Sequence, residues 1–170
     1  MAEVLEFDDY VRTRGAALVR LARLLTGDRH RGEDLAQEVL ARAFARWNHI
    51  SAVNTEAYLR RMLVNAAITR WRRLSSREIV VGDTGDRASR VDLESEVVER
   101  DVLWRHVRQL PAKQRAAVVL RYYEDLDDVS IAGLLDCSTV TVRTQVKRAL
   151  ATLRGKVGAD VALYSNGGTR

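Results

Sequence analysis

The chain has 170 residues, of which 46% are hydrophobic and 30% are charged, and its formal net charge at pH 7 is +5. This length suits one or two small domains with buried cores, and the basic charge favours an anionic partner. No apolar run is long enough to cross a bilayer, the first ten residues lack a secretory signal pattern, and the single cysteine cannot form an internal disulfide. We therefore predict a cytoplasmic protein without a membrane span.

Helical spacing of apolar residues predicts three helices in residues 1–75. The first ends at a Thr-Gly-Asp break, the second covers about residues 28–47 and the third about residues 55–74. The predicted buried stripes are Leu18, Leu21, Ala22 and Leu25; then Ala36, Leu40, Ala43, Phe44 and Trp47; then Leu59, Met62, Leu63, Ala66 and Trp71. Because β-type alternation is scarce and the sequence has one proline, Pro111, we predict an all-α fold.

The composition changes after residue 75. Residues 76–93 are rich in Gly, Ser, Asp and Arg and lack helical periodicity, which predicts a flexible linker. Residues 94–155 again show amphipathic spacing, and we predict that residues 156–170 form a disordered tail. The predicted architecture is two small helical domains joined by the linker, the second of them a helix-turn-helix domain.

The helix-turn-helix pattern closes the second domain. A short helix, VSIAGLL, can be capped by Asp127 or Asp128, and the tight break DCS leads into a longer helix whose N-cap is Ser138. Apolar residues of the longer helix share one face, opposite its basic side chains. These apolar residues are Val142, Val146, Ala149 and Leu153.

The polar face of this last helix suits DNA. Hydroxyl groups at a helix N-terminus can bind phosphate, arginine can read guanine in the major groove, and a threonine methyl can contact thymine. The candidate DNA-binding residues are Ser138, Thr139, Thr141, Arg143, Thr144, Lys147 and Arg148. The pattern alone is also compatible with a solvated amphipathic helix that ends a bundle.

The stretch from Leu110 to Arg154 resembles the C-terminal domain of extracytoplasmic-function sigma factors of bacterial RNA polymerase, in particular the actinobacterial sigma-E-like group. It contains, in order, Leu-Pro, Arg, an apolar run, Tyr-Tyr-Glu-Asp, Ile-Ala, Ser, Thr-Val-Arg, Arg-Ala and Leu-Arg. It departs from the family at Ser130, where Glu is usual, and at Asp136, where Gly is usual. The resemblance implies that this domain reads the −35 promoter element and binds the polymerase flap.

A second resemblance lies in the predicted second helix. Asp34, Gln37 and Glu38, at offsets of zero, three and four, form one acidic and amide patch in a segment similar to the family's polymerase-binding helix. The resemblance implies that the patch grips a basic coiled coil on the polymerase clamp, and carboxylates suit an arginine-rich helix. Taken alone, the patch is better explained as a capped, solvated first turn with acids placed to favour the helix dipole.

The predicted third helix has a basic stripe opposite its apolar one, and the family's equivalent helix reads the −10 promoter element. The loop before it, residues 49–55, corresponds to the family segment that captures a flipped base. His49, Ser51 and Asn54 are the polar candidates there; Trp47, Tyr58 and Trp71 could stack on bases, although such aromatics are more often core. The predicted −10 residues are Asn54, Arg60, Arg61, Asn65, Thr69, Arg72 and Arg73.

Three rival classes fit less well. An enzyme is disfavoured because no Glu-x-x-His pair, phosphate loop or dinucleotide fingerprint occurs, and we predict no cofactor or metal. A ligand-responsive repressor or activator that binds DNA without polymerase remains the alternative, but it needs no acidic patch on the second helix. A docking adaptor leaves the recognition face unexplained. The resemblance implies core RNA polymerase, promoter DNA and an anti-sigma factor as partners.

Overall fold

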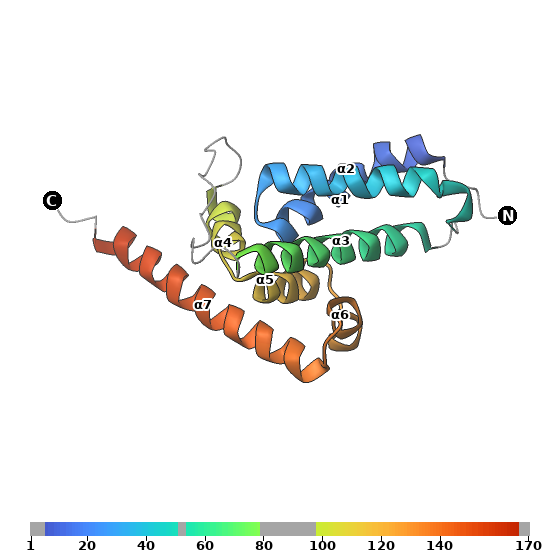
Figure 1. Cartoon of the computed structure of the whole chain (residues 1–170). Coiled ribbons are helices and arrows are strands. Elements are labelled where there is room, and N and C mark those ends of the chain that lie inside the picture. Colours follow the sequence, from blue (N-terminus) through green and yellow to red (C-terminus); the bar gives the residue numbers. More distant parts are fainter. Residues whose placement is uncertain (1–5, 51–53, 79–97, 167–170) are drawn as a thin grey trace. The chain divides into compact units, whose positions relative to one another are not determined.

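The computed structural model describes residues 6–50, 54–78 and 98–166, and the chain divides into two compact units, Met1–Arg87 and Ala88–Arg170. All regular secondary structure in these described residues is helical, as the sequence predicted. Figure 1 shows the helices of each unit in chain order. Each unit has its own buried apolar residues.

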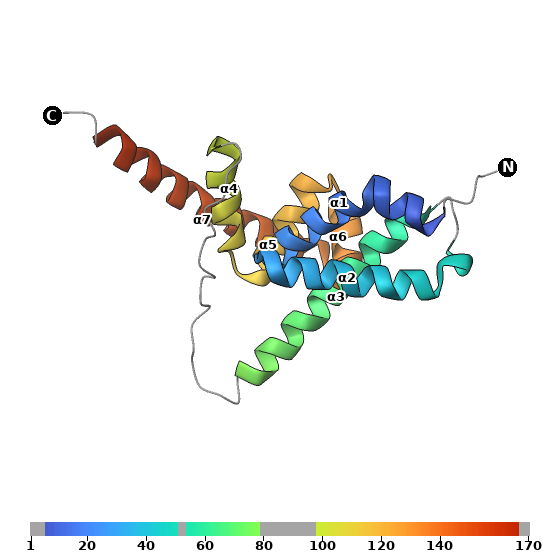
Figure 2. The same ribbon diagram turned by 90° about the horizontal axis from the view of Figure 1, so that it is seen from above.

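The first unit is a three-helix arrangement of α1 (Phe7–Thr26), α2 (Arg29–Ala45) and α3 (Thr55–Glu78), with a short 3-10 helix η1 (Trp47–His49) after α2. Each of the three long helices packs against the other two (Figures 1 and 2). The last turns of α3 project beyond α1 and α2 (Figure 2). The largest fully buried side chains of this unit are Leu25, Leu35, Val39, Leu59, Leu63 and Val64.

The corner between α1 and α2 brings two backbones very close together. Gly27 ends α1 in the left-handed conformation, with φ 72°, and donates its N–H to the carbonyl of Arg23 over 2.9 Å. Gly32 of α2 is buried against α1 so closely that a Cβ there would lie 2.6 Å from the Cα of Arg23. A glycine at position 32 is therefore required for this helix crossing.

The second unit is organised around its longest helix. It contains α4 (Val98–Arg108), α5 (Ala112–Val118), a π-helical turn η3 (Val119–Tyr123), α6 (Asp128–Leu135) and α7 (Thr139–Asn166). Helices α4, α5 and α6 all pack against α7. The largest fully buried side chains are Val107, Leu110, Val119, Leu120, Ile131 and Val142.

A buried arginine joins α4 to α5. Arg115 is only 7% exposed, and its Nη1 donates to the carbonyl oxygens of Arg108 at 2.9 Å and Leu110 at 3.0 Å. These bonds satisfy one backbone acceptor at the end of α4 and one in the turn that follows it. Arg115 therefore fixes the turn that leads into α5.

The turn of the helix-turn-helix is formed without the glycine that is usual in the resembling family. Asp136 follows α6 with φ 52° and ψ 54°, the left-handed conformation that glycine adopts most easily, and its N–H bonds the carbonyl of Ala132. Aspartate tolerates this region better than most residues. Ser138 then caps α7, because its Oγ accepts the N–H of Thr141 at 3.1 Å.

Several sequence predictions are wrong in detail. Helix α3 continues to Glu78, so residues 76–78 of the predicted linker are helical, and α7 continues to Asn166 where a disordered tail was predicted. No proline interrupts either extension, and glycine lowers helix propensity without preventing a helix. Residues 79–93 of the predicted linker lie outside the described residues. The predicted domain limits at 75 and 94 therefore stay predictions.

The end of the predicted second buried stripe is also wrong. Phe44 is 65% exposed and Trp47 is half-buried in η1 rather than at the end of α2. Both rings contact Phe7 of α1 edge to face, with ring centroids 5.0 and 5.1 Å apart. Helix α2 ends at Ala45, and the chain then turns, so the helical spacing no longer applies to Trp47.

Replacement of Gly32 by alanine tests the helix crossing. We expect Gly32→Ala to lower the free energy of unfolding by about 1–3 kcal/mol, because its methyl group would collide with backbone atoms that cannot rotate away. Gly15→Ala is the matched control in α1: its Cβ would meet only the Cγ1 of Val11 at 3.5 Å, so it should be neutral or stabilising. Urea unfolding followed by circular dichroism measures both. Equal stability of the two variants would contradict the close crossing.

Candidate protein and nucleic-acid interfaces

The structure divides the predicted acidic patch of α2 into two parts. Asp34 and Gln37 are exposed, whereas Glu38 is half-buried. The Glu38 carboxylate accepts Nη2 of Arg70 in α3 at 2.8 Å and pairs with Arg42, one turn along α2, at 2.5 Å. Glu38 therefore joins α2 to α3, and Asp34 and Gln37 are the patch residues exposed to solvent.

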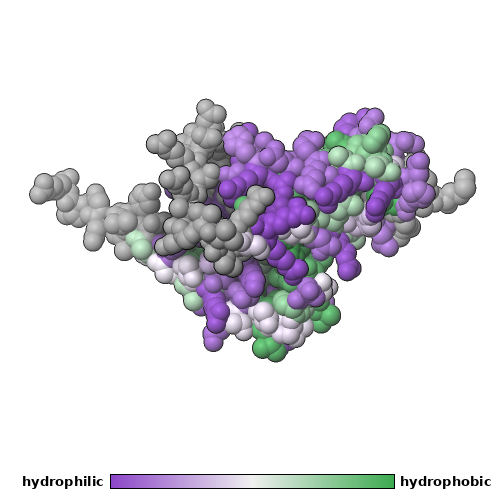
Figure 3. Space-filling view, in the orientation of Figure 1, coloured by the Kyte–Doolittle hydropathy of each residue, from purple (hydrophilic) through white to green (hydrophobic). Residues whose placement is uncertain are grey.

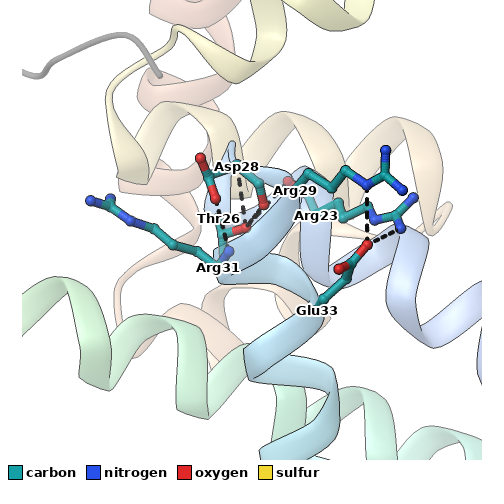
Figure 4. Close-up of polar contacts among 6 residues, drawn as sticks. All are labelled: Arg23, Thr26, Asp28, Arg29, Arg31 and Glu33. Carbon is teal, nitrogen blue, oxygen red and sulfur yellow. Dashed lines mark hydrogen bonds and ion pairs between the residues drawn. The ribbon is translucent and has the colours of Figure 1, made fainter. Parts of the chain in front are cut away.

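A network of polar contacts fixes the start of α2 beside this patch (Figure 4). Asp28 caps the helix by accepting the N–H of Arg31 at 2.8 Å. Glu33 accepts Nε of Arg29 at 3.2 Å and also pairs with Arg23 of α1. Hydrogen bonds from Arg23 and then from Arg29 lower the pKa of the Glu33 carboxyl, so these contacts favour its charged form. The backbone that presents Asp34 is thus held to α1.

The predicted stripe of α3 is largely solvent-facing. Arg60 is half-buried and the other α3 residues of the stripe are exposed. Thr69 donates its hydroxyl to the carbonyl of Asn65, 2.9 Å away. Figure 3 shows hydrophilic side chains over α2 and α3 on the side in view. The exposed stripe residues are Arg61, Asn65, Thr69, Arg72 and Arg73.

A pocket lies at the start of α3, where the sequence predicted capture of a flipped base. Its volume is about 290 Å³, and it brings His49 and Asn54 together; Ser51 lies outside the described residues. Tyr58, 39% exposed, lines it as well, whereas the half-buried Trp47 and Trp71 do not. Sequence reasoning missed two lining residues, Arg46 and Ile50, because no motif pointed to them.

A second hollow occurs on the last turns of α3. Thr69, Arg72, Arg73 and Ser76 line a space of about 450 Å³. Ser76 was assigned to the linker from the sequence, but it is helical and donates its hydroxyl to the carbonyl of Arg72 at 2.8 Å. The two guanidinium groups of this hollow form a surface suited to phosphate.

The helix-turn-helix presents most of its predicted DNA-binding residues to solvent. Ser138, Thr141, Lys147 and Arg148 are exposed, with Thr139 and Thr144 half-buried. Thr144 donates its hydroxyl to the carbonyl of Val140 at 3.0 Å. The opposite face is buried through Val142, Val146, Ala149 and Leu153, as the spacing predicted.

Two features of this surface were missed from the sequence. Val140 is 67% exposed at the start of α7, beside the predicted residues, and hydrophobic side chains are visible where α6 meets α7 (Figure 3). Arg143, predicted as a reading residue, donates Nε to the Asp128 carboxylate at 2.8 Å. The spacing of apolar and basic residues in α7 predicts neither feature. Val140 belongs to neither of the two predicted faces, and Asp128 belongs to another helix.

Within the described ranges, no group of three or more His, Cys, Asp or Glu side chains could hold a metal ion. None of the described helices combines the length and the apolar character that a bilayer crossing demands. Cys137 is half-buried in the turn before α7, and burial raises the pKa of its thiol. A raised pKa lowers the fraction of reactive thiolate. The exposed polar surfaces of α2, α3 and α7 are therefore the candidate functional sites.

Each of the two units matches a known protein family. Residues 10–77 match sigma-70 region 2, and residues 100–153 match sigma-70 region 4. The first match covers α2 and α3 with their polar faces, and the second covers the helix-turn-helix. The chain belongs to the extracytoplasmic-function sigma factors of RNA polymerase.

Two named relatives match most of this chain. An RNA polymerase sigma-E factor of Streptomyces coelicolor is 39% identical over 160 residues, which cover 94% of this chain and 90% of that protein. The RNA polymerase sigma-E factor of Streptomyces avermitilis is 39% identical over 153 residues, covering 89% of this chain and 85% of that protein. The similarity therefore includes both units.

The fold also resembles solved structures. The sigma factor RpoE from Bartonella quintana, in complex with the anti-sigma factor NepR, superposes with a TM-score of 0.69 at 21% identity, over 91% of this chain and 98% of that one. CnrH, in complex with the cytosolic domain of CnrY, gives a TM-score of 0.56 at 20% identity, over 91% of this chain and 88% of that one. At these identities the likeness concerns the fold.

Proposed function

We propose that this protein binds core RNA polymerase and directs initiation at a specific set of promoters, with each unit contacting both polymerase and DNA. The main support for the proposal is that the three surfaces predicted from the sequence, on α2, α3 and α7, expose polar side chains. The opposite face of each of these helices is buried. Both units also match sigma-70 regions in the expected order. The protein acts non-enzymatically, in the cytoplasm, where the transcription machinery operates.

The polymerase contact of the first unit is assigned to α2. Asp34 and Gln37 are exposed on a helix whose start is fixed by capping and ion pairs, so a partner meets a preorganised surface. A carboxylate next to an amide suits a basic helix on the polymerase clamp. Glu38 contributes by holding α2 against α3 through Arg70.

The −10 element is assigned to α3 and the pocket at its start. The exposed stripe combines guanidinium groups for phosphates with Asn65, whose amide can pair with a base edge. The pocket of about 290 Å³ offers Tyr58 for stacking and His49 and Asn54 for hydrogen bonds to a flipped base. Promoter opening is thus placed in the first unit.

The −35 element is assigned to α7 in the major groove, and the second unit also contacts the polymerase flap. Support comes from the cap at Ser138, which fixes the helix N-terminus, and from the exposed Lys147 and Arg148 on the next turns. Exposed apolar and polar surfaces on both units also fit an anti-sigma factor that covers them when transcription is not required.

Charge reversal at Asp34 tests the polymerase contact. We expect Asp34→Lys to reduce co-purification with core RNA polymerase at least tenfold, because it places a cation against a basic coiled coil. Its stability should change by no more than about 0.5 kcal/mol, since the side chain is exposed. Asp8→Lys, an exposed site on α1 with the same charge change, is the control and should still bind. Normal binding by folded Asp34→Lys would contradict the assignment.

A pre-melted promoter separates the two DNA surfaces. Arg148→Ala should weaken −35 binding by about 1–3 kcal/mol through loss of a base contact, whereas Asn65→Ala should impair opening. Run-off transcription on duplex and bubble templates should show rescue of Asn65→Ala by the bubble and little rescue of Arg148→Ala. Arg154→Ala, an exposed arginine later on α7, is the control and should transcribe normally on both templates. Equal rescue of Asn65→Ala and Arg148→Ala would show that the division of roles is wrong.

A further inference from the structure

The start of α6 holds a carboxylate that contacts the DNA-reading helix. Asp128, the first residue of α6, accepts Nε of Arg143 in α7 at 2.8 Å and forms an ion pair with Arg121 of η3. We propose that Asp128 is a positioning residue for sequence readout: it fixes the Arg143 guanidinium in the orientation that reads a base pair of the −35 element. This inference rests on the proposed role of α7 in −35 recognition.

The side chains of Asp128, Arg121 and Arg143 differ in burial in the way that a positioning role requires. The Asp128 side chain is 19% exposed and that of Arg121 is 28% exposed, whereas the Arg143 side chain is 68% exposed. The Asp128 carboxylate and Arg121 therefore form a partly buried ion pair, and the exposed Arg143 is held against it. A partly buried ion pair is screened less by salt than one in open solvent.

The capping of α6 does not require the Asp128 carboxylate. Asp127 is the N-cap, and its Oδ1 accepts the N–H of Ser130 at 2.7 Å. The two carboxylates that start α6 are thus divided between two tasks: Asp127 caps the helix and Asp128 contacts the arginines. Loss of the Asp128 carboxylate leaves the cap in place.

The atom used in the contact leaves the reading edge of Arg143 available. The carboxylate takes the Nε–H, and the two Nη groups keep four N–H donors, enough for a bidentate contact with O6 and N7 of guanine. An unrestrained arginine loses rotamer freedom when it binds, and it can turn to a phosphate instead of a base. The contact with Asp128 reduces both effects, so its benefit is discrimination between sequences.

The Asp128 carboxylate also lowers the affinity for DNA of any sequence. A negative charge at the DNA-facing surface repels phosphates, and it neutralises part of the Arg143 charge that non-specific binding uses. Removal of this charge should therefore leave binding to unrelated DNA unchanged or increased while sequence discrimination falls. A residue that only stabilised the fold would lower both kinds of binding together.

The test measures base preference with the complete chain assembled on core RNA polymerase. Duplexes with a randomised −35 hexamer are selected by the wild-type complex and by complexes with Asp128→Ala, Asp128→Asn, Arg143→Ala, Arg148→Ala and the double variant Asp128→Ala/Arg143→Ala. Bound DNA is sequenced, and binding to a fixed unrelated duplex is measured in parallel. Thermal unfolding of each variant is recorded beside the selection.

The expected result is a loss of preference at the same base pairs in Arg143→Ala and Asp128→Ala. Asp128→Ala should lower discrimination there by about 3- to 10-fold, the size expected when one rotamer-rich side chain loses its preorganisation. Asp128→Asn, which keeps an acceptor oxygen for the Nε–H, should retain more discrimination than Asp128→Ala. In the Arg143→Ala background, Asp128→Ala should cause no further loss.

Four results would overturn the inference. Unchanged preference in Asp128→Ala, or an equal loss with and without Arg143, would show that Asp128 does not act through this arginine. If Arg143→Ala keeps its preference while Arg148→Ala loses it, the positioning role fails and −35 recognition by α7 stands. If neither arginine variant changes any base preference, the proposed role of α7 fails as well.

Discussion

The burial of one apolar stripe on each helix decides where the polar surfaces of both units lie. Successive residues of an α-helix are rotated by about 100°, so the buried residues decide which neighbours face solvent. On α2, Leu35 and Val39 are fully buried, and Asp34 and Gln37 point away from them. Glu38 lies only about 60° from Leu35 around the helix, which places it at the margin of the packed face, where Arg70 of α3 reaches it.

The same constraint operates on α7, but there the reading surface depends on a second helix. Val142 and Val146 are buried and turn Arg143 and Lys147 outward. Helix α6 packs against the start of α7, so the first residue of α6 lies within reach of Arg143. The short turn through Asp136, in the left-handed conformation, sets this helix pair. The orientation of one arginine on the surface therefore depends on packing below it.

Helical spacing and local capping signals made much of the fold predictable. They located the buried stripes of α1 and α7 and the cap at Ser138, because these depend on residues close in sequence. Spacing placed Phe44 in the core wrongly: its ring contacts Phe7 but stays largely exposed, because spacing does not show which neighbouring elements reach the last turn of a helix. The contact between Asp128 and Arg143 and the pocket residues Arg46 and Ile50 depend on how separate segments pack, which a one-dimensional pattern does not contain.

We propose that this chain recognises promoters as part of RNA polymerase rather than alone. A promoter is first recovered from a randomised library by the chain together with core polymerase, and it is then labelled. Its fluorescence anisotropy is measured at physiological salt while the chain, the core enzyme or both are added. We expect tight, sequence-specific binding only when both proteins are present, and weak binding by the chain alone that a scrambled duplex matches. Tight and specific binding by the chain alone would contradict the proposed function and favour a regulator that acts without polymerase.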